Sequence, residues 1–196
     1  MAVVVTFNRK ELLLRCVKNI IAQTYKVKKI VVVDNASTDG SEKYIEQNIQ
    51  DFQSIIQWVR LKTNQGGAGG FYEGMKEAAK SDNYLWLMDD DGFPESNCLK
   101  NLLLKCDKNS FVGPVVLSDK DKYRLSFTIR KPGTRKVYKD YKDLKESSEN
   151  SMLEGIVIPF NGVLLHSDLI KRFGLPRKEY FIWGEDMEFM WRLKRG

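Results

Sequence analysis

Short apolar runs alternate with amphipathic stretches through the first 118 residues. The run AVVVTF at 2–7 is apolar and rich in β-branched residues, and the turn-forming Asn8 follows it, which predicts a buried strand. Between positions 10 and 23, apolar residues recur at helical spacing, and KKIVVVD at 28–34 predicts a second buried strand. A strand, a helix and a strand joined by short links indicate a right-handed crossover between parallel strands.

The same alternation continues along the chain. It predicts helices over 39–50, 71–80 and 95–106 and strands over 55–62, 84–88 and 111–117. NQGGAGG at 64–70 reads as a flexible glycine loop before the second of these helices. We therefore predict an α/β fold with a mainly parallel central sheet flanked by helices. In such sheets the loops after the strands form the ligand crevice, so polar residues at strand ends should converge on one edge.

The pattern changes beyond residue 118. YRLSFTI at 123–129 alternates loosely, as an antiparallel or edge strand does, and the polar, basic region 119–150 predicts a less regular insertion. Strand character returns over 152–165, and a short helix follows over 166–176 until Gly174 and Pro176 end it. A last helix begins after the aromatic run at 180–183. With no linker between two cores, we expect a single domain over 1–196.

Composition places the chain among ordinary globular proteins, since 42% of its 196 residues are hydrophobic. Three scattered cysteines and the lone His166 argue against a zinc site or a disulfide framework, and they favour a reducing compartment. We expect His166 to lie at the surface. The sequence has neither a signal-peptide pattern nor an apolar run of membrane-spanning length. These features predict a cytoplasmic protein, at most peripheral at the inner face of the membrane.

The net charge of +6 is concentrated in one segment. Residues 119–145 hold ten Lys/Arg and four Asp, which leaves 22 basic and 22 acidic residues elsewhere. A basic segment on a neutral body suits an anionic partner, such as a phosphate-bearing substrate or a membrane surface. A solvated loop whose lysines aid solubility explains the same composition, so both interpretations stay open.

Three adjacent aspartates, Asp89, Asp90 and Asp91, follow a fully apolar predicted strand. Neighbouring carboxylates raise one another's pKa unless a cation compensates, and Mg²⁺ or Mn²⁺ binds carboxylates together with substrate phosphates. In an extended segment Asp89 and Asp91 project to one side and Asp90 to the other. We therefore predict Asp89 and Asp91 as metal ligands and Asp90 as the partner of a hydroxyl on the nucleotide sugar. The alternative is a polar turn whose aspartates cap the next helix.

Two further motifs lie at the ends of predicted strands. Asp34 can accept a hydrogen bond from a pyrimidine N–H or a ribose hydroxyl, or it can be a turn residue. The glycine loop matches neither the dinucleotide fingerprint nor the P-loop. Its backbone N–H groups can approach a phosphate or a sugar closely, although a tight strand-to-helix turn explains it equally well.

Glu185 and Asp186 begin the last predicted helix. The positive end of a helix dipole lowers a carboxylate's pKa and keeps the group ionised. Such a carboxylate can act as a general base toward an acceptor hydroxyl, and Trp183 beside it can stack on a sugar of the acceptor. Helix capping is the alternative.

Taken in order, six segments resemble those of family 2 glycosyltransferases with the Rossmann-like GT-A fold. They are VVVTFNRKELLLRCVKNIIAQTY, KKIVVVDNASTDGS, NQGGAGGFYEGMKEA, YLWLMDDDGFPE, FNGVLLHSDLIKRFGLP and YFIWGEDMEFMWRL. They span nearly the whole chain outside the basic segment. GGAGG, the triple aspartate and FIWGEDMEF look most like the galactofuranosyl- and rhamnosyltransferase branch, which builds bacterial cell-surface polysaccharides.

The resemblance implies a metal-dependent hexosyltransferase. It would move a sugar, with inversion, from a UDP- or dTDP-linked donor to a hydroxyl of a glycan or lipid-linked acceptor, with Mg²⁺ or Mn²⁺ at the aspartates. Relatives of this kind carry further sequence after the last helix, so we expect this chain to be truncated at its C-terminus.

The resemblance also implies roles for individual residues. Asp34 would contact the base, and Asp186 falls on the family's general base with Glu185 as its acceptor-side neighbour. Others would bind the donor nucleotide: Thr6, Asn8 and Arg9 in the nucleotide pocket, and Asn64 and Gly67 at the donor.

Two rival functions make different demands on the sequence. A nucleotidyltransferase needs an N-terminal loop rich in glycine and lysine, whereas AVVVTF is followed by NRKELL. A nucleic-acid-binding module would use the basic residues of 119–145, but the sequence shows no helix-turn-helix and no aromatic–basic interleaving on a strand pair. We therefore expect no nucleic-acid partner. The sequence leaves the oligomeric state open.

Overall fold

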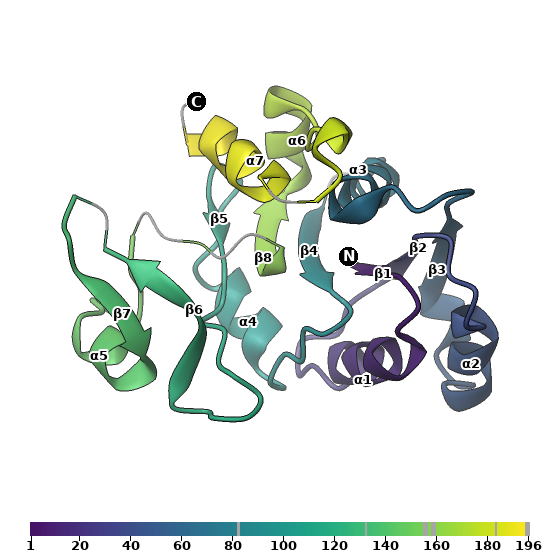
Figure 1. The fold of residues 1–196 in the computed structure, drawn as a ribbon, viewed down its shortest axis with the longest axis horizontal. Helices are drawn as coiled ribbons and strands as arrows, with labels where there is room; N and C mark the ends of the chain where they lie inside the picture. Colours follow the sequence, from purple (N-terminus) through teal and green to yellow (C-terminus); the bar gives the residue numbers. More distant parts are fainter. Residues whose placement is uncertain (82, 132, 155–156, 158–159, 183, 195–196) are drawn as a thin grey trace.

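The computed structural model describes residues 1–194 except 82, 132, 155–156, 158–159 and 183. Its centre is a six-stranded sheet of order β3-β2-β1-β4-β8-β5 (Figure 1). Four neighbouring strands are parallel: β1 (Ala2–Thr6), β2 (Ile30–Asp34), β3 (Ile56–Arg60) and β4 (Tyr84–Asp89). β8 (Asn161–His166) runs antiparallel to β4, and the short β5 (Phe111–Val112) pairs with β8. The predicted mainly parallel sheet is confirmed.

Helices cover both faces of the sheet (Figure 1). One face carries α1 (Lys10–Ile21), α2 (Ser41–Asn48) and α4 (Cys98–Leu103); the other carries α3 (Gly66–Ala78), α6 (Ser167–Phe173) and α7 (Glu185–Lys194). Alternate residues of β1 enter the two cores, with Val3 and Val5 in one and Ala2 and Val4 in the other. Because both faces are buried, the strands are continuous apolar runs. No helix of the described residues has the length and apolar character needed to cross a membrane.

The glycine run is the start of α3, so the predicted flexible loop is wrong. A Cβ on Gly70 would lie 2.4 Å from Cγ1 of Val5, and one on Gly74 would lie 2.5 Å from Cγ1 of Val3. Glycine at these positions therefore lets α3 pack directly on β1. The sequence indicated a loop because glycine disfavours a helix by about 1 kcal/mol per residue, and here tertiary packing outweighs that cost. α2, α4 and β5 are also shorter than predicted.

Residues 117–153 form a small hairpin unit with an apolar cluster of its own. β6 (Arg124–Arg130) and β7 (Val137–Asp140) form a two-stranded antiparallel sheet, and α5 (Tyr141–Glu146) follows. The cluster consists of Leu125, Ile129, Tyr138 and Leu144, with Leu117 and Leu153 packed against it. In Figure 1 the unit lies at the left, beyond α4 and β5, at the end of the molecule opposite β3 and α2. The predicted antiparallel strand is confirmed, and the basic insertion is more regular than expected.

Candidate functional site

The loops after β1, β2 and β4 meet at the carboxyl edge of the parallel strands. Thr6 pairs in register with Asp34, and Val5 pairs with Asp89, so the three strands end at the same level. The backbone N–H of Asp90 donates to the Val5 carbonyl at 3.2 Å, which fixes the start of the loop after β4. The predicted convergence of strand-end residues on one edge is confirmed for these three strands.

The Arg9 guanidinium forms ion pairs with two of the three aspartates. Its Nη1 donates to Oδ1 of Asp90 at 3.2 Å and to Oδ2 of Asp91 at 3.3 Å. Thr6 Oγ1 also donates to Asp90, at 2.7 Å. The Asp90 side chain is only 4% exposed, whereas those of Arg9 and Asp91 are each 52% exposed. Asp90 is thus a buried carboxylate held by two donors, and Arg9 and Asp91 form the solvent side of the cluster.

Asp89 has fewer partners for its negative charge than the other carboxylates at this edge. Within the described part of the chain, no residue donates a hydrogen bond to its side chain. Burial, followed by the charges of Asp91 and Asp90, raises the pKa of Asp89 to about 7, and Arg9 opposes this rise. Burial also raises the pKa of Asp90, although the Thr6 hydrogen bond and Arg9 oppose it. Asp89 is partly buried, and a carboxylate in such a position without a donor can be stabilised by a nearby cation.

The donor set at this edge fits an oxygen-preferring dication that also binds a phosphate. Asp89 ends β4 and Asp91 lies in the turn that follows, and both offer carboxylate oxygens, the ligands that Mg²⁺ and Mn²⁺ prefer. Over the described ranges, no three His, Cys, Asp or Glu residues group into a metal site by themselves. Mg²⁺ typically uses one or two carboxylates and completes its shell with water and substrate phosphate, which matches two protein ligands.

Asn8 and Asp34 join the loops that follow β1 and β2. Asn8 adopts a left-handed backbone with φ 53°, and its Oδ1 accepts a hydrogen bond from the Thr38 N–H at 2.7 Å. Ser37 bonds to both residues: its Oγ accepts from the Asn8 N–H at 2.9 Å, and its N–H donates to Oδ1 of Asp34 at 2.8 Å. Both predicted nucleotide ligands therefore also have a structural role in holding this loop pair. Their contact with a nucleotide stays a prediction.

Asn35 ties this edge to α3, and the sequence analysis did not single it out. Its Nδ2 donates to the Gly66 carbonyl at 2.8 Å, and its Oδ1 accepts from the Gln65 N–H at 2.8 Å. Asn64 adds a local bond, because its Oδ1 accepts from the Gly66 N–H at 2.9 Å. The signal available in the sequence was the position of Asn35 directly after Asp34 at the end of a strand.

Glu185 and Asp186 begin α7, which lies against the start of α3. The Phe181 carbonyl accepts from the Ala68 N–H at 3.1 Å, and a Cβ on Gly67 would lie 3.3 Å from Oε1 of Glu185. Glu185 also contributes to the raised pKa of Asp89. The loop before α7 therefore brings the two predicted acceptor-side carboxylates toward the aspartate cluster.

Glu185 and Asp186 differ in their environment. Glu185 is buried, and its Oε2 has no hydrogen-bond partner among the described residues. Burial raises the pKa of Glu185, so the predicted lowering by the helix dipole is wrong for this residue: burial outweighs the helix end. Asp186 is partly exposed and accepts a hydrogen bond from the Met187 N–H at 2.6 Å. Trp183, the predicted sugar-stacking residue, lies outside the described residues.

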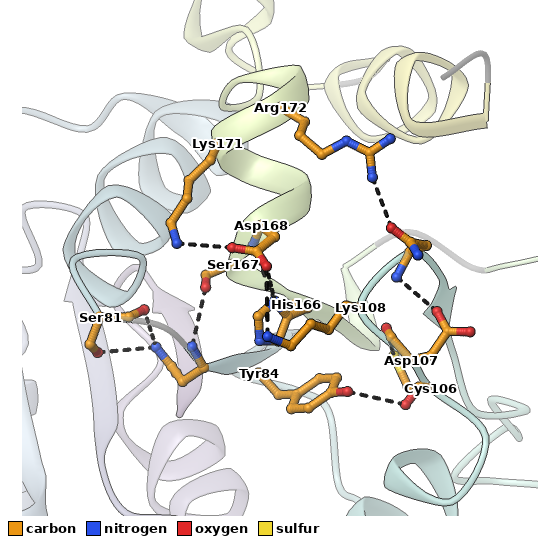
Figure 2. Close-up of polar contacts among 12 residues, drawn as sticks. Ser81, Tyr84, Cys106, Asp107, Lys108, His166, Ser167, Asp168, Lys171 and Arg172 are labelled. Carbon is orange, nitrogen blue, oxygen red and sulfur yellow. Dashed lines mark hydrogen bonds and ion pairs between the residues drawn. The ribbon is translucent and has the colours of Figure 1, made fainter.

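His166 is buried, so its predicted surface position is wrong (Figure 2). It ends β8, and its ring meets the Tyr84 ring edge-on with a centroid distance of 4.9 Å. Its Nδ1 accepts from the Asp168 N–H at 3.3 Å, and the Asp168 carboxylate accepts from Lys171 at 2.9 Å. Because β8 is antiparallel to β4, its last residue packs beside Tyr84 at the start of β4. This cluster therefore lies at the edge of the sheet opposite the aspartates.

Comparison with known sequences gives relatives along the whole chain. The sequence model of glycosyl transferase family 2 matches residues 1–164. Galactofuranosyltransferase GlfT1 of Mycolicibacterium smegmatis is 32% identical over 199 residues, a match that covers 99% of this chain and 65% of the relative. GlfT1 of Mycobacterium tuberculosis is 31% identical, over 99% of this chain and 64% of its own length. The chain thus spans slightly less than two thirds of these relatives.

Solved structures with the same fold include two transferases with bound Mn²⁺. The mannosyltransferase PcManGT from Pyrobaculum calidifontis, in complex with GDP-Man and Mn²⁺, aligns with a TM-score of 0.70 at 18% identity, over 98% of this chain and 50% of that chain. GalNAc-T7 with UDP, GalNAc and Mn²⁺ aligns with a TM-score of 0.70 at 17% identity, over 98% of this chain and 40% of that chain. At these identities the likeness concerns the fold.

Proposed function

Because the chain belongs to glycosyl transferase family 2 and has the GT-A fold, we propose that it transfers a sugar from a nucleoside-diphosphate sugar to a hydroxyl acceptor. The donor is UDP- or dTDP-linked, and the acceptor is a glycan or a lipid-linked glycan in the synthesis of a bacterial cell-surface polysaccharide. The likeness to galactofuranosyltransferases supports this acceptor class. Transfer proceeds with inversion at the anomeric carbon.

The proposal depends mainly on Asp89, a carboxylate at the carboxyl edge of the sheet whose negative charge has few partners. Its carboxylate has no donor within the described residues, and Asp91 lies beside it with half of its side chain exposed. These two residues would hold the dication. When bound, Mn²⁺ or Mg²⁺ neutralises charge on the leaving diphosphate.

The joined loops around this edge would bind the nucleotide. Asp34 accepts from the base, and the half-exposed Arg9 guanidinium can donate to a phosphate of the donor. Asp90 is the proposed partner of the ribose hydroxyl; it already accepts from Thr6 and Arg9, so the hydroxyl shares one of its oxygens. The other proposed nucleotide and donor contacts are Thr6, Asn8, Asn64 and Gly67.

Asp186 is the proposed general base. It takes a proton from the acceptor hydroxyl, whose oxygen attacks the anomeric carbon as the bond from that carbon to the diphosphate oxygen breaks. Its partial exposure leaves the carboxylate reachable by an acceptor. Glu185 lies on the acceptor side with one unpartnered oxygen among the described residues, which an acceptor hydroxyl can satisfy. Trp183 is proposed to stack on an acceptor sugar.

A thermal-shift panel tests the proposal. The chain is melted with UDP, dTDP and GDP and with their sugar conjugates, each with and without Mn²⁺. We expect stabilisation by one pyrimidine nucleotide that depends on the metal, because binding to the folded state alone raises the melting temperature. The double variant D89N/D91N should lose the shift, and D168N, the same change at the opposite edge, should keep it. A melting temperature that no nucleotide alters would contradict the proposal, as would a shift of equal size without metal.

A further inference from the structure

Within the hairpin unit, residues 117–153, the segment 119–145 has the same net charge as the whole chain, +6, and the unit is not part of the proposed transfer site. We propose that it is a docking surface for an anionic lipid bilayer. The proposal stands on the charge and exposed side chains of this unit and does not depend on the proposed transfer.

The cations of the hairpin unit are available to a partner. All ten Lys/Arg of 119–145 are exposed, and within the described residues none of them forms an ion pair. Of the four aspartates in the same segment, Asp119 is already paired with Arg15 of α1, at 3.1 Å. Since the rest of the chain is balanced at 22 basic and 22 acidic residues, the positive field of the molecule originates here.

Large apolar and aromatic side chains lie exposed among these cations. Tyr123 is 82% exposed, Phe127 45%, Val137 40% and Tyr141 38%. The Tyr141 N–H donates to the Tyr123 carbonyl at 2.8 Å, so the two tyrosines lie together at one end of the two-stranded sheet. A segment that served only solubility would gain nothing from leaving four such side chains in water.

Cations combined with exposed rings match the interface of an anionic bilayer. Lys and Arg are attracted to acidic headgroups, and tyrosine rings favour the headgroup level because one end is apolar and the other polar. Single-stranded nucleic acid would instead need a track of stacking rings along the basic surface. Phe127 is the only exposed aromatic on β6 and β7, since Tyr138 is buried, and Tyr123 and Tyr141 lie at one end of the two strands, so the exposed rings do not form a track.

Vesicle flotation with matched variants tests this surface. The chain, without nucleotide, is mixed at low salt with vesicles of phosphatidylcholine alone or of phosphatidylcholine with phosphatidylglycerol. We expect binding only to the second kind. The variant K122Q/K139Q/K142Q should bind about 100-fold more weakly, because each cation near such a surface contributes about fivefold. Y123S/F127S should bind several-fold more weakly.

A control variant distinguishes an effect of the hairpin unit from an effect of the net charge of the chain. K62Q/K100Q/K105Q removes three exposed lysines outside the unit and should bind like the wild type. Equal loss in both triple variants would overturn the proposal, as would an unchanged Y123S/F127S variant or a wild type that does not bind phosphatidylglycerol vesicles. Tighter binding to a single- or double-stranded oligonucleotide at the same salt would overturn it in favour of a nucleic-acid surface. Thermal melts confirm that each variant is folded.

Discussion

The two edges of the parallel strands differ in how far their polar groups are hydrogen-bonded. At the carboxyl edge, Asp89 lacks a donor and Glu185 keeps an unpartnered oxygen among the described residues. At the opposite edge, His166, Asp168 and Lys171 bond to one another (Figure 2). Buried polar groups in proteins are nearly always hydrogen-bonded, so the unpartnered Oε2 of Glu185, at the same edge as the partly buried Asp89, is a candidate contact for a ligand.

The comparison gives a rule for assigning roles within this chain. Groups that satisfy one another, such as His166 and Asp168, hold the end of β8 to the start of α6. Groups that can still accept a hydrogen bond or a cation, such as Asp89, are stabilised only when a ligand or a metal ion binds. We therefore expect substitutions at the opposite edge to change stability, and substitutions at the carboxyl edge to change ligand binding and rate.

The largest expected effect is on Asp186, the proposed general base. Asp186→Asn should lower the transfer rate by about 10²–10⁴-fold, because general acid–base catalysis contributes this much, while donor affinity stays unchanged. Initial rates with the sugar-nucleotide donor measure this. Asp168→Asn is the matched change at the opposite edge and should leave the rate unchanged. Wild-type turnover in D186N would remove Asp186 from its proposed role.

The next effect is on stability at the opposite edge. His166→Ala removes a buried ring that packs against Tyr84 and accepts the Asp168 N–H. We expect it to lower the free energy of unfolding by about 1–3 kcal/mol, because it removes a buried ring and leaves the partly buried Asp168 N–H unpaired, and to leave metal-dependent nucleotide binding intact. Urea unfolding and the nucleotide-induced melting shift measure the two quantities. If H166A abolished nucleotide binding while remaining folded, the division between the edges would be wrong.

A pH effect is expected at the carboxyl edge when no metal is bound. The pKa of Asp89 is raised to about 7, so the folded state binds its proton more tightly than the unfolded state does. The metal-free chain should therefore lose stability as pH rises from about 4 to about 7, by about 1 kcal/mol after allowing for solvent screening. Asp89→Asn should remove this dependence and be the more stable form at neutral pH. Identical pH profiles for D89N and the wild type would contradict this.

The smallest expected effects come from removing one exposed cation at each edge. Arg9→Met at the carboxyl edge and Lys171→Met at the opposite edge each remove an exposed cation that bonds to aspartate. Exposed ion pairs contribute about 0–1 kcal/mol, so K171M should be close to the wild type in stability. R9M should be less stable than K171M, because the buried Asp90 loses one of its two donors. Only R9M should weaken nucleotide binding, as calorimetric titration would show. Equal nucleotide affinity in the two variants would argue against Arg9 as a donor contact.

Much of the fold was predictable from the sequence because buried parallel strands are long apolar runs. The runs AVVVT and IVVVD can be recognised from their own residues, and the position of Asp89 at the end of a strand follows from the same pattern. β5 and the start of α3 were not predictable, since their bounds depend on pairing with β8 and on packing against Val5.

The site was only partly predictable because the residues that neutralise its carboxylates lie far away in the sequence. Arg9 lies 81 positions before Asp90, and no local pattern indicates that a loop after β1 supplies its counterion. Asn35 and the burial of His166 likewise depend on contacts between segments far apart in the chain. Periodicity places residues at the ends of strands, but it does not specify which side chains satisfy one another there.

The most direct test of the account is a Mn²⁺ titration followed by electron paramagnetic resonance, with and without the pyrimidine diphosphate selected by the thermal-shift panel. The wild type should remove the free Mn²⁺ signal when the nucleotide is present, and D168N should do the same. The variant D89N/D91N should leave the signal at the level of nucleotide alone. Retention of Mn²⁺ by D89N/D91N as strong as that of the wild type would contradict the claim that these carboxylates are completed by a phosphate-bound dication.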